Sequence, residues 1–223
     1  MKTLAVLSRK GGAGKTTIAV HLAVAAEAHG IATAIFDLDP QASAALWSDH
    51  RGDPIPAVVP AQAPRLPALL AQAKGNAADL VILDTAPNAD TIASEAANHA
   101  DVILIPCRPS GFDLDAIGAT VRLAQAARKP AYVIINAAPV QGVETAEATA
   151  ALTAAGLEVC PVVLHSRKAY ANRIHEGRTA QETDPTGKAA GEIRVLLLWV
   201  SKKANLLSKL QSNKKTRRQA GGR

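Results

Sequence analysis

Aromatic residues and long apolar runs are both scarce in this 223-residue chain. Only 3% of the residues are Phe, Trp or Tyr, so the core must be built mainly from Ala, Val, Leu and Ile. No apolar run approaches the roughly 20 residues that a membrane-spanning helix needs. The apolar stretch at residues 1–7 gives way to polar residues at Ser8 and is too short for a secretory signal. We therefore expect a cytoplasmic protein with one well-buried domain.

Cysteine is nearly absent as well, with only Cys107 and Cys160 in the chain. Two cysteines this far apart do not indicate a disulfide framework, and each follows or sits in an apolar run. A shared metal would need more ligands than two thiolates. We therefore expect two reduced thiols at strand ends.

Acidic residues are missing from the last 23 positions, where basic residues gather. The whole chain has 25 Lys and Arg against 19 Asp and Glu, a net charge of +6. Eight of the basic residues lie in 201–223, which leaves 17 basic and 19 acidic residues in 1–200. We therefore divide the chain into a domain at 1–200 and a basic tail at 201–223. Such a tail suits nucleic acid or an acidic membrane surface, or it is a solvated, disordered terminus.

Short apolar runs alternate with longer, Ala-rich amphipathic stretches. The predicted strands are 3–7, 32–36, 57–59, 80–83, 102–105, 132–135 and 159–164. The predicted helices are 15–29, 42–49, 90–98, 114–127 and 144–155. Apolar runs without alternation are typical of parallel strands covered on both faces. The pattern predicts an α/β fold in three layers, a doubly wound, mostly parallel sheet with helices on both faces.

A glycine-rich segment lies between the first predicted strand and the first predicted helix. It reads Lys10-Gly11-Gly12-Ala13-Gly14-Lys15-Thr16-Thr17. Glycines let the backbone turn several N–H groups toward one anion, and the helix N-terminus adds partial positive charge. Lys15 would reach the β- and γ-phosphates, and the Thr16 hydroxyl would bind Mg²⁺. The segment predicts a P-loop NTPase fold with a site for ATP and Mg²⁺.

Carboxylates follow two other predicted strands. Asp84 ends an apolar run, where a carboxylate is costly unless a cation or a donor pairs with it, and Mg²⁺ is the expected partner. After the second strand, Asp39 is placed to orient or deprotonate the attacking water, whereas Asp37 is expected to hold the loop. Because ligands bind beyond the carboxyl ends of the strands in such sheets, these side chains should lie near the triphosphate.

The phosphate loop departs from the general P-loop pattern. It has Arg9 where that pattern asks for glycine, and it carries an additional lysine, Lys10. This form resembles the deviant Walker A loop of the ParA/MinD family of ATPases. Residues 37–43 resemble that family's switch I, and residues 81–87 resemble its Walker B strand and switch II. The similarity extends to about residue 200 and implies an enzyme that converts ATP and water to ADP and phosphate, slowly and under stimulation by a partner.

The resemblance also implies a dimer. In that family the counterpart of Lys10 crosses a dimer interface to the partner's triphosphate. We therefore expect a homodimer with ATP, with Lys10, Lys15 and Asp39 as catalytic residues. The residues expected to bind ATP are Lys10, Gly11, Gly12, Ala13, Gly14, Lys15, Thr16, Thr17 and Asn136, the last near the base. The residues expected to bind Mg²⁺ are Thr16, Asp39 and Asp84.

The leading hypothesis for the output of this ATPase is DNA partition. An ATP-bound dimer would bind DNA non-specifically, and a small cargo-binding adaptor, similar to ParB, would stimulate its release. Arg167, Lys168 and Arg173 lie where resembling proteins hold the DNA backbone, although the two arginines could instead pair with carboxylates. The protein would be associated with the nucleoid when ATP is bound. With no residues before the first strand for a helix-turn-helix domain, a short ParA-type ATPase is expected.

Two alternatives remain open. A MinD-like ATPase would position itself on a membrane surface through a basic amphipathic C-terminal helix. Six apolar residues fall on one face of such a helix, namely Leu196, Trp199, Val200, Leu206, Leu207 and Leu210. A nitrogenase-iron-protein-like ATPase would need cysteines that bridge a dimer in glycine-rich surroundings, which neither cysteine has.

Overall fold

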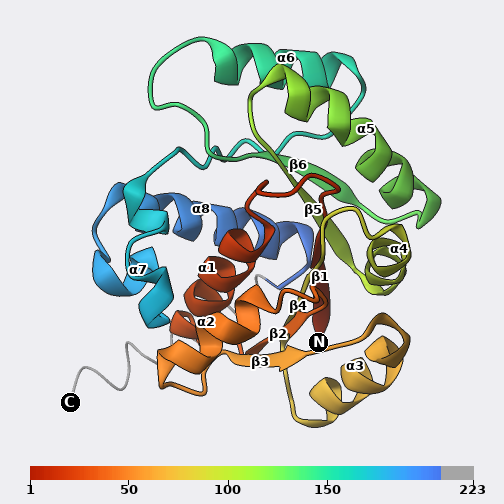
Figure 1. The fold of residues 1–223 in the computed structure, drawn as a ribbon, viewed down its shortest axis with the longest axis vertical. Coiled ribbons are helices and arrows are strands. Elements are labelled where there is room, and N and C mark those ends of the chain that lie inside the picture. The colour runs from red at the N-terminus through yellow and green to blue at the C-terminus, as the bar shows by residue number, and fades with distance from the viewer. Residues whose placement is uncertain (207–223) are drawn as a thin grey trace.

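The structure is a computed structural model that describes residues 1–206 (Figure 1). In this part of the chain one sheet is formed by β1 (Lys2–Val6), β2 (Thr33–Asp37), β3 (Ala57–Pro60), β4 (Leu80–Asp84), β5 (Val102–Cys107) and β6 (Ala131–Ile135). The strand order is β3-β2-β4-β1-β5-β6, and every pair is parallel. The chain first adds strands on one side of β1, where β4 lies, and then on the other side, where β5 lies. In parallel sheets this switch point is where a ligand crevice opens beyond the carboxyl ends.

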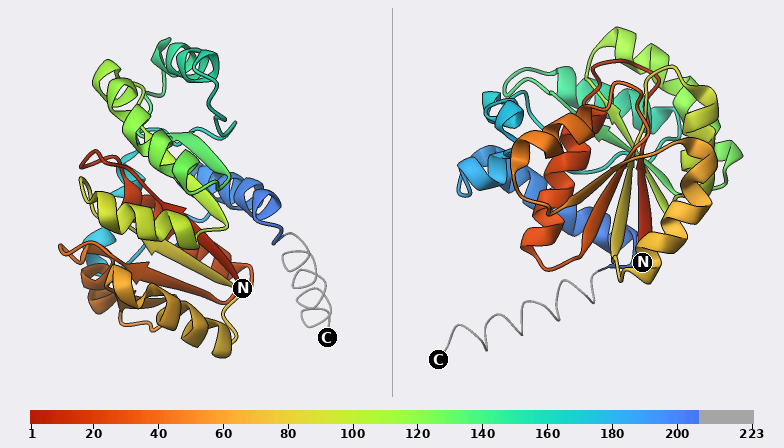
Figure 2. Two further views of the ribbon diagram at one scale, coloured as in Figure 1. Left: turned by 90° about the vertical axis from the view of Figure 1, so that its right-hand side faces the viewer. Right: turned by 60° about the horizontal axis from the view of Figure 1, so that its bottom comes forward.

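Helices cover both faces of the sheet (Figure 2). They are α1 (Lys15–Ala28), α2 (Ser43–Arg51), α3 (Leu66–Gly75), α4 (Asp90–His99), α5 (Gly111–Ala126), α6 (Glu144–Ala154), α7 (Ala180–Thr183) and α8 (Lys188–Lys203), with 3₁₀ turns η1 (Ala63–Arg65), η2 (Lys168–Tyr170) and η3 (Ile174–Glu176). Buried residues of α1, α2 and α8 share one core cluster, and those of α3 to α6 share the other. The predicted three-layer, doubly wound fold is confirmed.

Each strand supplies both core clusters by alternation. Leu4 and Val6 face the cluster of α1 and α8, whereas Ala5 and Leu7 face the cluster of α3 to α6. Because both faces are buried, both sets of side chains are apolar, and the strand reads as a continuous apolar run. This is why the strand positions could be recognised from composition.

The predicted strand at 159–164 is wrong. This segment runs beside β6 and makes only isolated bridges at its two ends, Val133 to Val159 and Ala138 to His165. The Cys160 N–H donates to the Val133 carbonyl at 2.7 Å, but the next N–H on that edge, from Val162, contacts Cys160 Sγ at 3.4 Å, and the Ile135 carbonyl accepts the Leu164 N–H instead. The apolar run is therefore an extended edge segment.

Helix α3 was not predicted, because the region around it is rich in proline. Pro67 occupies the first turn of α3, where the missing N–H has no intrahelical partner and the fixed φ favours a helix. The prolines of this region therefore lie before the helix or within its first turn. The short strand predicted at 57–59 is confirmed as β3.

The C-terminal helix packs into the core. Helix α8 crosses the predicted boundary at residue 200 and contacts α1, and Leu196, Val200 and Leu206 are buried. Leu206 lies beyond the end of the helix, and Leu207 and Leu210 lie outside the described residues. Residues 207–223 of the predicted basic tail also lie outside them. The apolar face considered for a membrane is thus used inside the domain over 196–206.

None of the helices within residues 1–206 combines the length and the hydropathy of a membrane span. The two cysteines are free and buried, Cys107 at the end of β5 and Cys160 in the edge segment. They belong to core clusters on opposite faces of the sheet, and burial raises the pKa of each thiol to about 11.

Candidate phosphate-binding site

The glycine-rich segment forms the turn between β1 and α1. Gly12 and Gly14 have φ values of 70° and 94°, in the left-handed region that glycine adopts without strain. Gly14 is the N-cap of α1, so the loop runs directly into a helix N-terminus. This is the strand-turn-helix context that a phosphate cradle requires.

Lys15 and Asp84 are buried charges at the centre of the site. Lys15 is 6% exposed and Asp84 is fully buried, and within residues 1–206 neither carboxylate oxygen of Asp84 has a hydrogen-bond partner. Burial raises the pKa of Asp84 to about 7, and the Asp37 carboxylate adds to that effect, against the influence of Thr16 and Lys15. Burial likewise lowers the pKa of Lys15. The Asp84 carboxylate and the nearby Thr16 hydroxyl supply oxygen ligands of the kind that would hold a hydrated Mg²⁺ ion.

Asp37 holds the segment that follows β2. It lies next to Asp84 in the register of β2 and β4. One of its carboxylate oxygens accepts the N–H groups of Ala44 and Ala45 at 2.9 and 3.0 Å, and the other accepts that of Asp39 at 3.1 Å. The predicted role of Asp37 in holding this loop is confirmed.

Asp39 is half-buried and lies farther along the same segment. Its carboxylate accepts the Gln41 N–H at 2.9 Å and contributes to a cavity of about 780 Å³ between this segment, the end of β3 and the start of α4. The structure thus brings Asp39 to the same edge of the sheet as Asp84 and Lys15. Its contact with the attacking water and the metal stays a prediction.

Lys10 is bound within its own chain. Its Nζ lies 2.5 Å from Oδ2 of Asp113 on α5, and the Ser110 hydroxyl donates to the same oxygen at 2.5 Å. Burial alone would raise the pKa of Asp113, but these two bonds outweigh it and hold that pKa below its usual range. Sequence reasoning missed Asp113 because it lies 103 residues from Lys10. The role of Lys10 across a dimer interface stays a prediction.

Three side chains donate to carbonyls of the phosphate loop. Lys15 donates to the Lys10 carbonyl at 3.5 Å, Asn136 donates to the Ala13 carbonyl at 2.7 Å, and Arg108 donates to the Gly12 carbonyl. Asn136, expected near the base, therefore reaches the phosphate loop itself. Arg108 was not identified from the sequence, because nothing near it in the chain links it to the loop.

The three basic residues predicted to contact DNA differ in their surroundings. Arg167 contacts Glu192 through Nε at 2.8 Å and Nη2 at 2.7 Å, and Arg173 pairs with Glu176 at 2.9 Å. Lys168 is exposed and, in the described part of the chain, has no carboxylate partner. The intramolecular pairing considered for the two arginines is thus present, and contact of all three with DNA stays a prediction.

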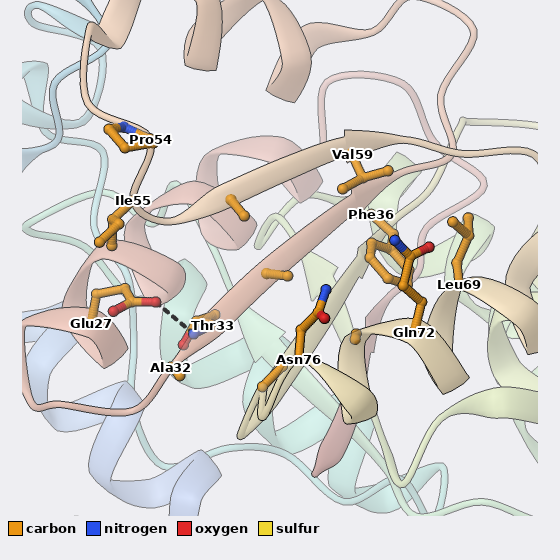
Figure 3. Close-up of a pocket in the computed structure, with 14 residues that line it drawn as sticks. Glu27, Ala32, Thr33, Phe36, Pro54, Ile55, Val59, Leu69, Gln72 and Asn76 are labelled. Carbon is orange, nitrogen blue, oxygen red and sulfur yellow. Dashed lines mark hydrogen bonds between the residues drawn. The ribbon is translucent and has the colours of Figure 1, made fainter.

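A separate cavity of about 290 Å³ lies toward the amino ends of β2 and β3, under α3 (Figure 3). Its walls are largely apolar, with Phe36, Val59 and Leu69 on one side, and Glu27 bonded to the Thr33 N–H at the other. None of the residues predicted to bind nucleotide, metal or DNA lines it. This cavity is therefore separate from the predicted nucleotide site at the carboxyl ends of the strands.

Residues 4–180 match the family model described as the CobQ/CobB/MinD/ParA nucleotide binding domain. The chain is 30% identical over 207 residues to maintenance of carboxysome distribution protein A from Halothiobacillus neapolitanus, covering 87% of this chain and 94% of that protein. It is 29% identical over 180 residues to the protein ParA of Rhizobium radiobacter, covering 76% and 81%.

Two solved structures share the fold. McdA from Cyanothece in complex with ATP has a TM-score of 0.72 at 18% identity and covers 92% of this chain and 97% of its own. MinD from Pyrococcus horikoshii with Mg-ADP also has a TM-score of 0.72, at 20% identity, and covers 90% and 96%. These two structures confirm the predicted fold, and the family match over residues 4–180 confirms the predicted family.

Proposed function

The chain belongs to the CobQ/CobB/MinD/ParA family of nucleotide-binding proteins, and we propose that it hydrolyses ATP with Mg²⁺ in order to position a cargo. The observation that carries the proposal is the unpaired, buried Asp84 beside Lys15 and Thr16, at the mouth of a glycine-rich turn. A bound Mg²⁺ supplies the charge that stabilises the phosphate oxygens. Lys15 neutralises phosphate charge from the protein side, and Asp39 orients the attacking water.

We further propose that ATP joins two copies and that the dimer binds DNA without sequence preference. Lys10 supports this, because its side chain is partly exposed beside a cavity of about 550 Å³ that Arg122, Asn88 and small residues of α5 also line. In the dimer, Lys10 leaves Asp113 and reaches the partner's triphosphate. A cargo-bound adaptor stimulates hydrolysis, which releases the dimer from DNA. The protein is cytoplasmic in this cycle and is associated with the nucleoid while ATP is bound.

The cargo is a large body, either a DNA molecule or a protein assembly. One relative is named for the distribution of carboxysomes, which favours a protein assembly, and another is named ParA. A membrane surface is the weaker alternative, since Leu196, Val200 and Leu206 are buried in the domain.

Lys10→Ala tests the cycle. This variant should bind ATP with nearly unchanged affinity but should neither dimerise normally nor hydrolyse ATP. Lys2→Ala is a matched control, because Lys2 also pairs with an aspartate, Asp101 at 3.1 Å, at the opposite end of β1. Mass from light scattering and phosphate release are the measurements, and wild-type turnover by Lys10→Ala would refute the role in the dimer.

Two further experiments identify the surface that the dimer binds. Asp39→Ala should accumulate as an ATP-bound dimer that retains DNA in a gel-shift assay. Co-sedimentation of this variant with anionic liposomes but not with DNA would favour the membrane alternative. An Asp39→Ala protein that stays monomeric with ATP would contradict the assignment of Asp39.

A further inference from the structure

Two side chains approach the phosphate loop from neighbouring strands. Arg108 directly follows β5, and Asn136 directly follows β6. The Arg108 guanidinium donates to the Gly12 carbonyl, and the Asn136 amide donates to the Ala13 carbonyl at 2.7 Å. Because β5 and β6 are paired in parallel, both side chains leave the sheet at the edge where the loop lies.

These bonds fix the direction of two N–H groups. In a trans peptide the C=O and the N–H of one plane point in opposite directions. A bond to the Gly12 carbonyl therefore turns the Ala13 N–H away from Arg108, and a bond to the Ala13 carbonyl turns the Gly14 N–H away from Asn136. In a P-loop, N–H groups at these positions belong to the run that faces the phosphates.

The two N–H groups are available for an anion. Within residues 1–206, neither the Ala13 N–H nor the Gly14 N–H donates to another group of the chain, although Ala13 is only 1% exposed. Unpartnered backbone donors are rare where the chain is buried, as it is at Ala13, and at a helix N-terminus such donors suit an anion. Because Arg108 and Asn136 hold the two carbonyls, the N–H groups of Ala13 and Gly14 remain available as donors to phosphate oxygens.

The contact with Asn136 is also tight. A Cβ atom built on Gly14 would lie 2.2 Å from the Asn136 amide nitrogen, closer than any real contact of this kind. Together with the φ of 94°, this close approach explains why position 14 holds glycine. The loop and Asn136 are therefore packed against each other, with no room for an intervening atom.

We propose that Arg108 and Asn136 are positioning residues that hold the phosphate loop in its anion-binding conformation from the side opposite the phosphates. The proposal rests on the proposed binding of nucleotide. It assigns Asn136 to the loop rather than to the base, and it adds Arg108, whose bond is to protein rather than to a phosphate. Both residues act before the nucleotide arrives, so the loop does not have to be ordered by the ligand.

Calorimetric titration with Mg-ADP and with magnesium tripolyphosphate tests the proposal. The variants are Arg108→Ala and Asn136→Asp, the second being isosteric and unable to donate to a carbonyl. Each should bind both probes about tenfold more weakly, which is the effect expected when one hydrogen bond that orients the loop is lost. Arg108→Lys keeps a donor and should recover most of the affinity.

The control is Arg194→Ala. Arg194 also donates from its guanidinium to a backbone carbonyl, that of Pro185 at 3.2 Å, but on α8 and away from the loop. Its affinities should equal those of the wild type. The melting temperature of each variant without nucleotide shows that the fold is retained.

Three outcomes would overturn the proposal. Asn136→Asp that loses ADP but keeps tripolyphosphate would show that Asn136 reads the base. If Arg108→Ala weakens the binding of tripolyphosphate but not of Mg-ADP, Arg108 contacts the third phosphate directly. Unchanged affinity for both probes would show that Arg108 has no role. Because Mg-ADP binding needs neither a dimer nor DNA, failure of the proposed cycle would leave these results intact, whereas a wild type that binds neither probe would refute the nucleotide function itself.

Discussion

Within residues 1–206, largely buried charges are unpaired in one region of the molecule and paired in another. The first region is the phosphate edge, meaning the carboxyl ends of the strands around Lys15 and Asp84, and the second is the segment 165–192. At the phosphate edge, Asp84 is buried with neither oxygen bonded within the described part of the chain, and the pKa of Lys15 is lowered by burial. In the segment 165–192, Glu192 accepts bonds from His165, Arg167 and Tyr170. Burial alone would raise the pKa of Glu192, but these bonds outweigh it and lower that pKa.

The difference indicates which region is built around a ligand. Unbonded buried charge destabilises a protein unless something binds to it, so the phosphate edge is stable only in part without its cation and anion. In the segment 165–192 the largely buried carboxylate, Glu192, already has its hydrogen-bond partners within the chain. A polyanion that binds there has to use exposed groups such as Lys168 and Arg178, or displace an existing partner of the arginines.

The same chemical change should therefore have opposite effects on stability in the two regions. Asp84→Asn should lower Mg²⁺-dependent hydrolysis by at least about 100-fold, because the site loses the carboxylate proposed to bind the metal. It should also raise the free energy of unfolding of the nucleotide-free protein by about 1 kcal/mol at pH 8, since a buried charge is removed. Phosphate release and urea denaturation are the measurements, and a destabilised variant would contradict this reading of Asp84.

Glu192→Gln is the counterpart of that change. It should lower the free energy of unfolding by about 1–3 kcal/mol, because donors on three residues, His165, Arg167 and Tyr170, lose a charged acceptor. Glu176→Gln is the control, as the Arg173–Glu176 pair is largely exposed and should contribute less than about 1 kcal/mol. If the two substitutions lower the free energy of unfolding equally, the bonds to Glu192 contribute no more than an exposed ion pair, and the contrast between the two regions is wrong.

His21 connects the two regions and should give a pH dependence. Its ring contacts the Thr17 carbonyl at 2.8 Å and accepts the Ala180 N–H at 3.2 Å, and burial lowers its pKa from 6.5 to about 4. Between these values the unfolded chain binds more protons than the folded chain, so stability is full above pH 6.5 and falls as the pH falls toward 4.

In numbers, this effect should be about 1–2 kcal/mol between pH 7.5 and pH 5. His21→Asn should show a shallower decrease over the same range in urea denaturation. A variant with the same slope as the wild type would mean that other groups cause the pH dependence.

The smallest expected effect concerns DNA. Lys168→Ala should weaken ATP-dependent binding to DNA about threefold and reduce the salt slope by about 1, since its charge is free to meet a phosphate. Arg167→Ala should weaken it less, because Arg167 is engaged by Glu192. Lys74→Ala on α3 is the control, with fluorescence anisotropy at several salt concentrations as the measurement. A larger loss in Arg167→Ala would show that DNA displaces Glu192.

Features that depend on neighbours in sequence could be predicted. The phosphate loop is one continuous segment, and Asp84 stands at the end of an apolar run, so motif and position were sufficient. The parallel sheet followed from uninterrupted apolar strands. For the same reason Asp37 could be assigned to its loop, which it bonds within eight residues.

Features that depend on distant partners could not be predicted. The fold brings together three pairs that lie 25 or more residues apart in the sequence, and no local pattern marks them: Lys10 with Asp113, Gly12 with Arg108, and Arg167 with Glu192. The prediction of a strand at 159–164 failed for a related reason, because a ladder needs a partner at every second residue and the Val162 N–H contacts Cys160 Sγ rather than β6. Composition alone shows neither which distant residues form a pair nor whether a strand keeps its register along its neighbour.

The bond between Asn136 and the Ala13 carbonyl also affects when the phosphate loop can form during protein synthesis. It joins residues 123 positions apart, so the phosphate loop, encoded at the start of the chain, is completed late. At synthesis rates of about 5–20 residues per second, roughly 6–25 s separate the making of Ala13 from the making of Asn136. During that interval a growing chain carries its phosphate-binding sequence without Asn136, and its full affinity for nucleotide should appear only after β6 has emerged from the ribosome.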